Sequence, residues 1–456
     1  MTKGVTELFA LPGRKVGHFS RNSMASAFDH ADLNAALALG RRPARVTASL
    51  PWYNRPMRKA FALLLALSSF AFAQSKPKVR AITAFIRIDA AHLDSQIAEA
   101  AAFLNAARDE YKASGFEVET IRVVLQPLAD YTKGMKHADA VALLHKYGAL
   151  AAKAGITPNL GAIMLTDDDS RAAVDLAIDV LASEKINGSL IVAADNGIHW
   201  KSIREAARLV KAVAAKSPNG GGNLNFATAA MVKPYTPFYP AAWHDGTGKT
   251  FAVGLESANI VAEVFAQYHE PGPAETKLAE ALTKHLLVAE AAAVRIAASS
   301  KWTYAGIDPT PAPLGEVSIA RAIESFIGAP FGSGGTMTAA SVITRAVQST
   351  PVKQVGYSGL MVPILEDVIL AKRWEEKTYN MDSLLAYSAV CAGGLDTIPL
   401  PGDISEERLA RIMGDVASLA WKWRKPLAAR LLPAPGKKPG DRTAFEDGRM
   451  ANTIVR

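Results

Sequence analysis

Cysteine is almost absent from this chain, because Cys391 is the only one in 456 residues. One unpaired thiol fits a reducing or an oxidising compartment, so cysteine content does not decide where the protein resides. The spacings HExxH, HxH and CxxC are also missing, which argues against a zinc or iron site, and no metal is expected. A Walker loop and a GxGxxG turn after a strand are absent too, so the sequence identifies no cofactor.

Excess positive charge is missing from most of the chain. Residues 1–73 carry ten Lys/Arg against three Asp/Glu, whereas the remainder carries 41 against 40. A protein that binds phosphate backbones needs a basic surface, and a nearly neutral body does not supply one. We therefore expect no nucleic-acid partner.

No hydrophobic run is long enough to span a bilayer comfortably, but one short run has a recognisable form. It begins at Met57 with Arg58 and Lys59, continues through 14 uncharged residues and ends in Ala-Phe-Ala at residues 71–73. This pattern is typical of a signal peptide over 57–73, with the mature chain starting at Gln74. The expected location is periplasmic or secreted, with no stable membrane span after cleavage, and cytoplasmic if the leader is not used.

Residues 1–56 precede this leader, although signal peptides ordinarily begin at the start codon. Their arginine-rich, poorly periodic sequence indicates an overextended gene start or a disordered segment. No stretch of 74–456 resembles a flexible linker, so that part is expected to form one large domain.

Apolar patterns alternate between two periods in the first half of the mature chain. Strands are expected at 78–88, 116–126, 159–165, 188–194 and 223–232. Helices are expected between them at 93–113, 137–153, 170–184 and 200–216. Strands separated by helices indicate βα units with parallel pairing, and hence an α/β fold.

The second half combines helices with loops rich in glycine and proline. Helices are expected near 274–298, 315–327, 336–348 and 405–423. The loops between them carry many residues with special backbone conformations, and loops on an α/β frame are where ligands usually bind.

Five of these segments resemble an uncharacterised bacterial family often labelled pyruvate formate-lyase-like. They are FYPAAWHDGTGKTFAVGLE (238–256), GIDPTPAP (306–313), VGYSGLMVPILED (355–367), YSAVCAGGLDTIPLPGD (387–403) and KPLAARLLPAPGKKPGD (425–441). The resemblance covers roughly 78–456. It implies an α/β barrel resembling the ten-stranded glycyl radical enzyme barrel, surrounded by helices, and no established reaction. The leader is a departure from relatives that lack an export signal.

The residues argue against glycyl radical chemistry. The radical enzymes of this fold place their cysteine before a late glycine loop, whereas QVGYSG (354–359) precedes Cys391 here. Fold analogy alone does not carry the chemistry. Cys391 is interpreted as a residue that lines the ligand pocket, with a nucleophilic role as the alternative.

The tetrapeptide WHDG (243–246) places an imidazole beside a carboxylate, with Glu256 ten residues further on. Such a pair suits general acid–base work, so His244 is a catalytic candidate and Glu256 a ligand-binding one. The alternative is a loop whose side chains cap neighbouring turns.

Six carboxylates stand in or beside the later loops: Asp308, Glu316, Glu366, Asp367, Asp396 and Asp403. If several meet at one barrel mouth, they can hold a cation or a general acid with a raised pKa. Asp308 and Asp396 are proposed as catalytic, and Glu366 and Asp403 as ligand-binding. Each alone can instead cap a turn.

Further ligand contacts are expected from backbone amides and late cations. FGSGGT (331–336) opens a helix, so Gly334, Gly335 and Thr336 can present N–H groups to an anion or simply form an N-cap. The loop at 355–367 adds Tyr357 and Ser358. The basic run at 422–442 is either a solvated face or a source of cations for an acidic substrate, represented by Arg430 and Lys437.

Two functions remain open from the sequence. One is an exported protein with a pocket for a small anionic metabolite, possessing acid–base activity. The other is a non-catalytic exported protein that binds a small metabolite. The sequence decides neither whether the protein is an enzyme nor its oligomeric state.

Overall fold

The structure, a computed structural model, describes residues 76–456, which belong to one compact unit, Ala73–Arg456. The predicted leader over 57–73 and the segment 1–56 lie outside the described residues. Within 76–456, no helix combines the length and the apolar character needed to cross a membrane.

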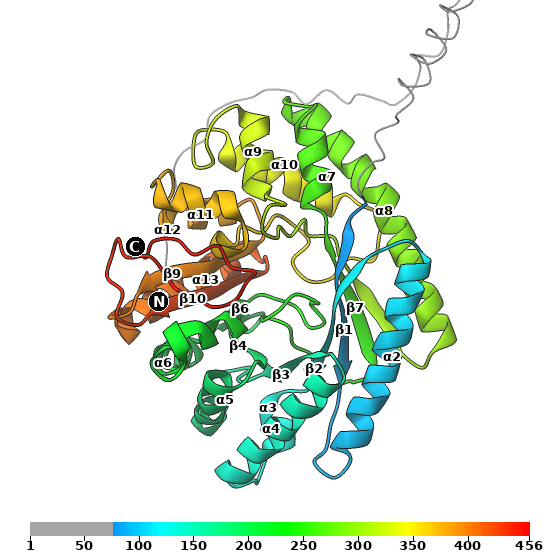
Figure 1. The fold of residues 1–456 in the computed structure, drawn as a ribbon, viewed down its shortest axis with the longest axis vertical. Coiled ribbons are helices and arrows are strands. Elements are labelled where there is room, and N and C mark those ends of the chain that lie inside the picture. The colour runs from blue at the N-terminus through cyan, green and yellow to red at the C-terminus, as the bar shows by residue number, and fades with distance from the viewer. Residues whose placement is uncertain (1–75) are drawn as a thin grey trace, which may run out of the picture. The chain divides into compact units, whose positions relative to one another are not determined.

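Ten strands form one mixed sheet (Figure 1). They are β1 (Lys78–Ile86), β2 (Val118–Leu125), β3 (Thr157–Ala162), β4 (Asn187–Ala194), β5 (Gly197–Ile198), β6 (Phe226–Ala230), β7 (Thr250–Glu256), β8 (Thr303–Asp308), β9 (Gly393–Pro401) and β10 (Leu427–Ala434). Their order is β8-β7-β1-β2-β3-β4-β6-β10-β9, with the short β5 paired to β4. β1, β2, β3, β4 and β6 run parallel, and the pairs β7–β8 and β10–β9 flank them in the opposite direction.

Twelve α-helices are described in 76–456. They are α2 (Leu93–Ala113), α3 (Leu128–Thr132), α4 (His137–Lys153), α5 (Arg171–Ser183), α6 (Trp200–Lys216), α7 (Ala258–Phe265), α8 (Pro271–Ser299), α9 (Ile319–Ile327), α10 (Thr336–Gln348), α11 (Val368–Glu375), α12 (Met381–Ser388) and α13 (Glu406–Trp423). Two 3₁₀ segments, η1 (Pro218–Asn225) and η2 (Ile364–Glu366), complete the elements.

The helices cover one face of the sheet with an apolar core. In β2, Ile121, Val123 and Leu125 belong to this core, while Val124 belongs to a separate buried cluster. Successive side chains of a strand point to opposite faces, so the two clusters lie on the two sides of the sheet. The apolar face of α6, including Ile203 and Val210, packs into the helix-side core.

The β6–β7 connection, residues 231–249, packs on the other face. Thr83 donates a hydrogen bond from its hydroxyl to the carbonyl of Pro237 at 3.0 Å. The Asn159 amide donates to the carbonyl of Pro240 at 3.2 Å, and the Tyr239 hydroxyl donates to the carbonyl of Val123 at 2.8 Å. These bonds join the connection to β1, β2 and β3, so it covers part of the sheet face that the helices leave uncovered.

The expected α/β class is confirmed, but a closed barrel is not. The edge strands β8 and β9 do not pair with each other in the described chain. Residues 353–363 instead form isolated parallel bridges to both edges, Ile307 with Gln354 and Pro363 with Asp396. The structure therefore shows a ten-stranded sheet whose edges are linked by an irregular segment.

The predicted elements of the first half agree with the structure within a few residues, and 93–113, 137–153 and 200–216 agree at both ends. Four strands of the second half, β7 to β10, were not predicted, and β9 lies in a segment that the sequence presented as a loop. β9 has the sequence GGLDTIPLP and is buried throughout. Its two glycines and two prolines are depleted in strands, so the sequence resembles a loop.

Candidate functional site

His244 lies in the β6–β7 connection and is fully buried. Its Nε2 lies 3.1 Å from the carbonyl oxygen of Ile86, and its Nδ1 accepts a hydrogen bond from the Gly246 backbone at 3.1 Å. Nε2 therefore carries the proton. Burial lowers the pKa of His244 to about 4, so the ring is neutral near pH 7. Both ring nitrogens hold backbone groups, which makes this histidine a clamp for the connection.

Asp308 ends β8 and holds the 355–359 loop. One carboxylate oxygen accepts from the Tyr357 backbone N–H at 2.7 Å, and the other accepts from the Ser358 N–H at 3.1 Å. The Thr310 hydroxyl and backbone N–H also donate to it, at 2.6 and 3.1 Å. Burial raises the pKa of Asp308 to about 6 against the effect of these bonds. The predicted residues Asp308, Tyr357 and Ser358 thus lie together. The Asp308 carboxylate is occupied by the backbone N–H groups of the other two residues.

Gly356 allows this close approach. A Cβ at this position would stand 2.2 Å from a carboxylate oxygen of Asp308, and its φ of 76° lies in the left-handed region. Gly356 thus serves the clamp around Asp308.

A different set of polar side chains forms an ion-pair chain on the sheet face opposite the helices. We call it the charged cluster: Arg80 (β1), Glu256 (β7), Glu366 (η2), Asp396 (β9) and Arg430 (β10). Arg80 binds Glu256 at 2.7 Å and Glu366 at 3.2 Å. Arg430 binds Glu366 at 2.5 Å and Asp396 at 2.7 Å. Glu366 therefore joins two guanidiniums that come from distant parts of the sheet.

Strand pairing brings these residues together. β1 and β7 run antiparallel with Lys78 opposite Glu256, which places Arg80 beside that carboxylate. β9 and β10 run parallel, with a register shift next to Arg430. The Leu365 backbone N–H donates to the Thr397 hydroxyl at 2.9 Å, which fixes η2 against β9. The Glu366 carboxylate then lies within reach of Arg80 and Arg430.

The carboxylates of the charged cluster differ in their proton affinity. Burial raises the pKa of Glu256 to about 7; Arg80 opposes this shift, and the neighbouring carboxylate of Glu119 adds to it. Burial also raises the pKa of Asp396, against the effect of Arg430. Burial acts in the same direction on Glu366, yet Arg430 and Arg80 bring its pKa below the usual range. Glu256 is thus the carboxyl group positioned to exchange a proton near neutral pH.

Arg122 on β2 is a buried cation without a carboxylate partner in the described chain, and 7 % of its surface is exposed. Its Nε donates to the Thr120 hydroxyl at 2.9 Å and its Nη1 to the Pro237 carbonyl at 3.3 Å. The guanidinium carbon stands 4.7 Å from the centroid of the Tyr239 ring. Burial and the nearby Arg80 lower the pKa of Arg122 to about 10, which leaves it charged at neutral pH.

Arg80, Arg122 and Glu119 were not predicted from the sequence, because they lie inside strands and not in the glycine- and proline-rich loops. A signal was present: KVRAITAFIRI and FEVETIRVVLQ carry charges inside otherwise apolar strands. A charge inside a buried strand needs a partner, and so marks a site.

The remaining predicted residues lie apart from the charged cluster. Gly334 and Gly335 are exposed, and the Thr336 hydroxyl accepts from the Gly332 backbone at 3.0 Å, which closes the turn before α10. Cys391 lies in the helix-side core, where burial raises the pKa of its thiol to about 11. Asp403 is exposed beyond β9, and the carbonyl of Lys437 accepts from the Gly402 backbone at 3.0 Å.

Glu316 is exposed, and Asp367 is buried as the cap of α11, where its carboxylate accepts from the backbone of Ile369 and Leu370. Within the described residues, no group of three or more His, Cys, Asp or Glu is arranged to hold a metal ion.

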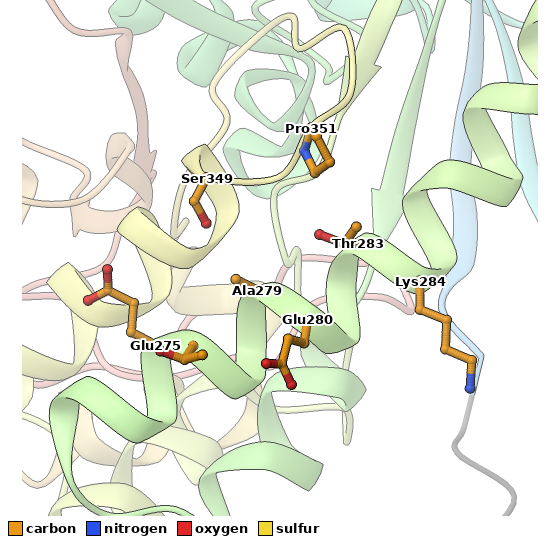
Figure 2. Close-up of a pocket in the computed structure, with 8 residues that line it drawn as sticks. Glu275, Ala279, Glu280, Thr283, Lys284, Ser349 and Pro351 are labelled. Atoms are coloured by element: carbon orange, nitrogen blue, oxygen red, sulfur yellow. The ribbon is translucent and has the colours of Figure 1, made fainter. Parts of the chain in front are cut away.

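A hollow on the outer surface lies between α8 and the residues that follow α10 (Figure 2). Figure 2 shows Glu275, Ala279 and Thr283 along α8, facing Ser349 and Pro351. Glu275 is paired with Arg345 at 2.6 Å. None of the predicted site residues and none of the charged cluster lines this hollow.

Comparison with known proteins places these features in a family. Residues 71–446 match the family described as "Uncharacterised ACR (DUF711)". A UPF0210 protein of Pyrobaculum arsenaticum is 28 % identical over 346 residues, which are 72 % of this chain and 76 % of the relative. UPF0210 proteins of Methanopyrus kandleri and Acetivibrio thermocellus are 28 % and 29 % identical, over 62 % and 61 % of this chain and 65 % of each relative.

Proposed function

We propose that this chain, which belongs to the uncharacterised DUF711 family, binds a small anionic molecule beside the charged cluster. Arg122 is the observation that carries the proposal. In this site Arg122 supplies the positive charge, and Glu256 supplies an acid or base.

A buried guanidinium without a counter-ion is costly, because removing a charge from water is unfavourable unless another charge compensates it. Arg80 and Arg430 are compensated by four carboxylates, whereas Arg122 is held only by a hydroxyl, a carbonyl and an aromatic face. A carboxylate or phosphate would supply the missing charge, and guanidiniums bind both in a planar, two-point manner.

The acid–base part of the proposal rests on Glu256. A pKa of about 7 allows this carboxyl group to accept and return a proton under ordinary conditions. Arg80 and Glu119 border it, so a change in either alters its proton affinity. Of the residues predicted from the sequence, Asp396 and Glu366 belong to the same cluster and are positioned to hold Arg430 rather than to react.

We also propose that the sheet closes into a barrel resembling that of the glycyl radical enzymes. Supporting this, residues 353–363 run parallel to β8 at Gln354 and parallel to β9 at Pro363. A tenth long strand at this position would close the ring. Radical chemistry is not part of the proposal, because Cys391 lies in the core on the helix side.

Export remains part of the proposal. The leader pattern ends at Ala73, and the family match begins at residue 71. Mass analysis of protein recovered from the periplasm or medium should find Gln74 at the amino terminus. A cytoplasmic product that retains Met57 would overturn export without affecting the site.

A non-catalytic binding function is the second candidate. It is favoured by His244 and Asp308, because two of the three residues predicted to be catalytic hold backbone groups with all their hydrogen-bonding atoms. Binding without turnover would then be the whole activity.

One experiment separates the two candidates. The protein is incubated in D₂O with pyruvate, 2-oxoglutarate, malonate or inorganic phosphate, while thermal shift records binding and proton NMR records exchange at carbon. Catalysis predicts exchange that Glu256→Gln abolishes although the thermal shift persists. Binding without exchange supports the second candidate, and the absence of any shift overturns both.

A further inference from the structure

Three exposed tryptophans lie on or against the carboxyl-terminal half of α13. Trp200, Trp421 and Trp423 expose 52, 40 and 59 % of their surface. Large exposed aromatic groups are uncommon on a protein surface, and a group of them marks a contact with something else. None of the three belongs to the charged cluster.

The helix geometry explains how the indoles are arranged. Trp200 lies against Gly414, since a Cβ there would stand 3.3 Å from its indole. Trp421 follows Gly414 by seven residues, so it lies on the same side of α13, about two turns further along. Trp423 is the last residue of the helix and lies on the other side of its end. Two indoles therefore flank the exposed Lys422.

Cations accompany the indoles. Arg424 has its guanidinium carbon 5.2 Å from the centroid of the Trp421 ring, and it pairs with Asp195 at 3.7 Å. Lys233 pairs with the same carboxylate at 2.8 Å. We call Trp200, Trp421, Trp423, Lys422, Arg424 and Lys233 the tryptophan patch; Asp195 is the carboxylate that its ion pairs share.

The tryptophan patch lies at the end of the sheet away from Arg80 and Glu256. Asp195 directly follows β4 and Lys233 follows β6, so the patch stands at the carboxyl ends of these strands. Arg80 stands near the amino end of β1, which runs parallel to them. A contact at the patch therefore leaves the proposed anion site free.

We propose that the tryptophan patch docks the protein on the surface of an anionic membrane. Indoles favour the boundary between water and lipid because they join an apolar ring to a hydrogen-bond donor. Lysine and arginine are attracted to the negative headgroups, and three cations against one carboxylate match that charge. A long acidic polymer fits less well, since residues 74–456 are almost neutral in charge.

The test is flotation of the full chain with phosphatidylcholine vesicles that contain about 30 % phosphatidylglycerol, beside vesicles of phosphatidylcholine alone. Lys422→Gln should weaken binding to the anionic vesicles about fivefold. The double variant Trp421→Ser, Trp423→Ser should weaken it about tenfold or more. Brominated phosphatidylcholine should quench tryptophan fluorescence in the wild type and much less in the double variant.

Matched controls come from another exposed surface. Leu287→Ala on α8 and Lys301→Gln after it remove a similar apolar group and a similar charge, and both should bind like the wild type. All proteins carry the same apolar segment 60–73, so differences among them report the patch.

Two results would overturn the proposal. One is flotation and quenching of the patch variants equal to the wild type, which would assign membrane binding elsewhere. The other is unchanged flotation with lost retention on heparin or RNA, which would assign the patch to an acidic polymer.

Discussion

Two sets of buried polar side chains in this protein use their hydrogen bonds differently. His244 and Asp308, which we call the backbone clamps, direct their bonds to main-chain groups and to a neighbouring threonine. The charged cluster pairs side chains with side chains, and Arg122 beside it has no carboxylate partner in the described chain. A buried titratable residue is therefore insufficient to define a site, since its partners decide whether it can meet a ligand.

The largest effect is expected from breaking the charged cluster. Arg430→Met leaves Glu366 and Asp396 buried without their shared cation, which should lower the free energy of unfolding by about 3–5 kcal/mol. Urea unfolding measures this. Arg345→Met is the matched control, because its pair with Glu275 is exposed and should contribute about 1 kcal/mol or less. An equal loss of unfolding free energy in Arg430→Met and Arg345→Met would contradict the distinction between the buried and the exposed ion pairs.

His244 from the clamps and Glu256 from the charged cluster should respond oppositely to pH. His244 has a pKa of about 4 when folded and an ordinary value near 6.5 when unfolded, so its contribution is complete above pH 6.5 and is lost as pH falls toward 4. The loss should reach about 3 kcal/mol. Glu256 has a raised pKa of about 7, so its contribution is present below pH 4.5 and is lost as pH rises through 7.

Unfolding free energies between pH 4.5 and 6.5 test these signs. His244→Gln should remove the rising part of the profile, and Glu256→Gln should reduce the falling part, to which Asp308 also contributes. A profile that both substitutions leave unchanged would show that neither group titrates as the structure indicates.

Breaking the second clamp should cost stability but not ligand binding. Asp308→Asn replaces an acceptor of the Tyr357 or Ser358 backbone N–H with a donor, which should cost about 2–3 kcal/mol. Asp403→Asn changes an exposed aspartate and serves as the control. If Asp308→Asn instead abolished anion binding at full stability, Asp308 would belong to the site.

The smallest effect on stability is expected at Arg122. Arg122→Met removes a buried charge that lacks a carboxylate partner, so the free energy of unfolding should change by about 1 kcal/mol or less, or even rise. A loss of several kcal/mol in urea unfolding would show that the guanidinium serves the fold.

The sequence predicted the frame better than the site. Strands and helices of the first half were recognisable because apolar side chains repeat at two or at three to four residues, as in 78–88 and 93–113. β9 was hidden because its glycines and prolines are typical of loops, and its burial depends on partners distant in sequence. The local sequence pattern does not show which distant strands pair with β9.

Among the candidate residues, Glu256, Glu366, Asp396 and Arg430 were all named from the sequence and meet in the charged cluster. Their meeting depends on the pairing of β1 with β7 and of β9 with β10, which spacing along the chain does not reveal. Arg80 and Arg122 were overlooked since they lie within strands. Gly334, Gly335, Thr336 and Cys391 were named for their local context, which describes turns and core packing equally well.

The affinity of a small anion for wild type and for Arg122→Met tests the central claim most directly. Titration calorimetry with the anion that gives the largest thermal shift among pyruvate, 2-oxoglutarate, malonate and phosphate should show binding that Arg122→Met weakens about tenfold or more. Arg345→Met should bind like the wild type. Equal affinity in wild type and Arg122→Met, or no binding by the wild type, would contradict the account.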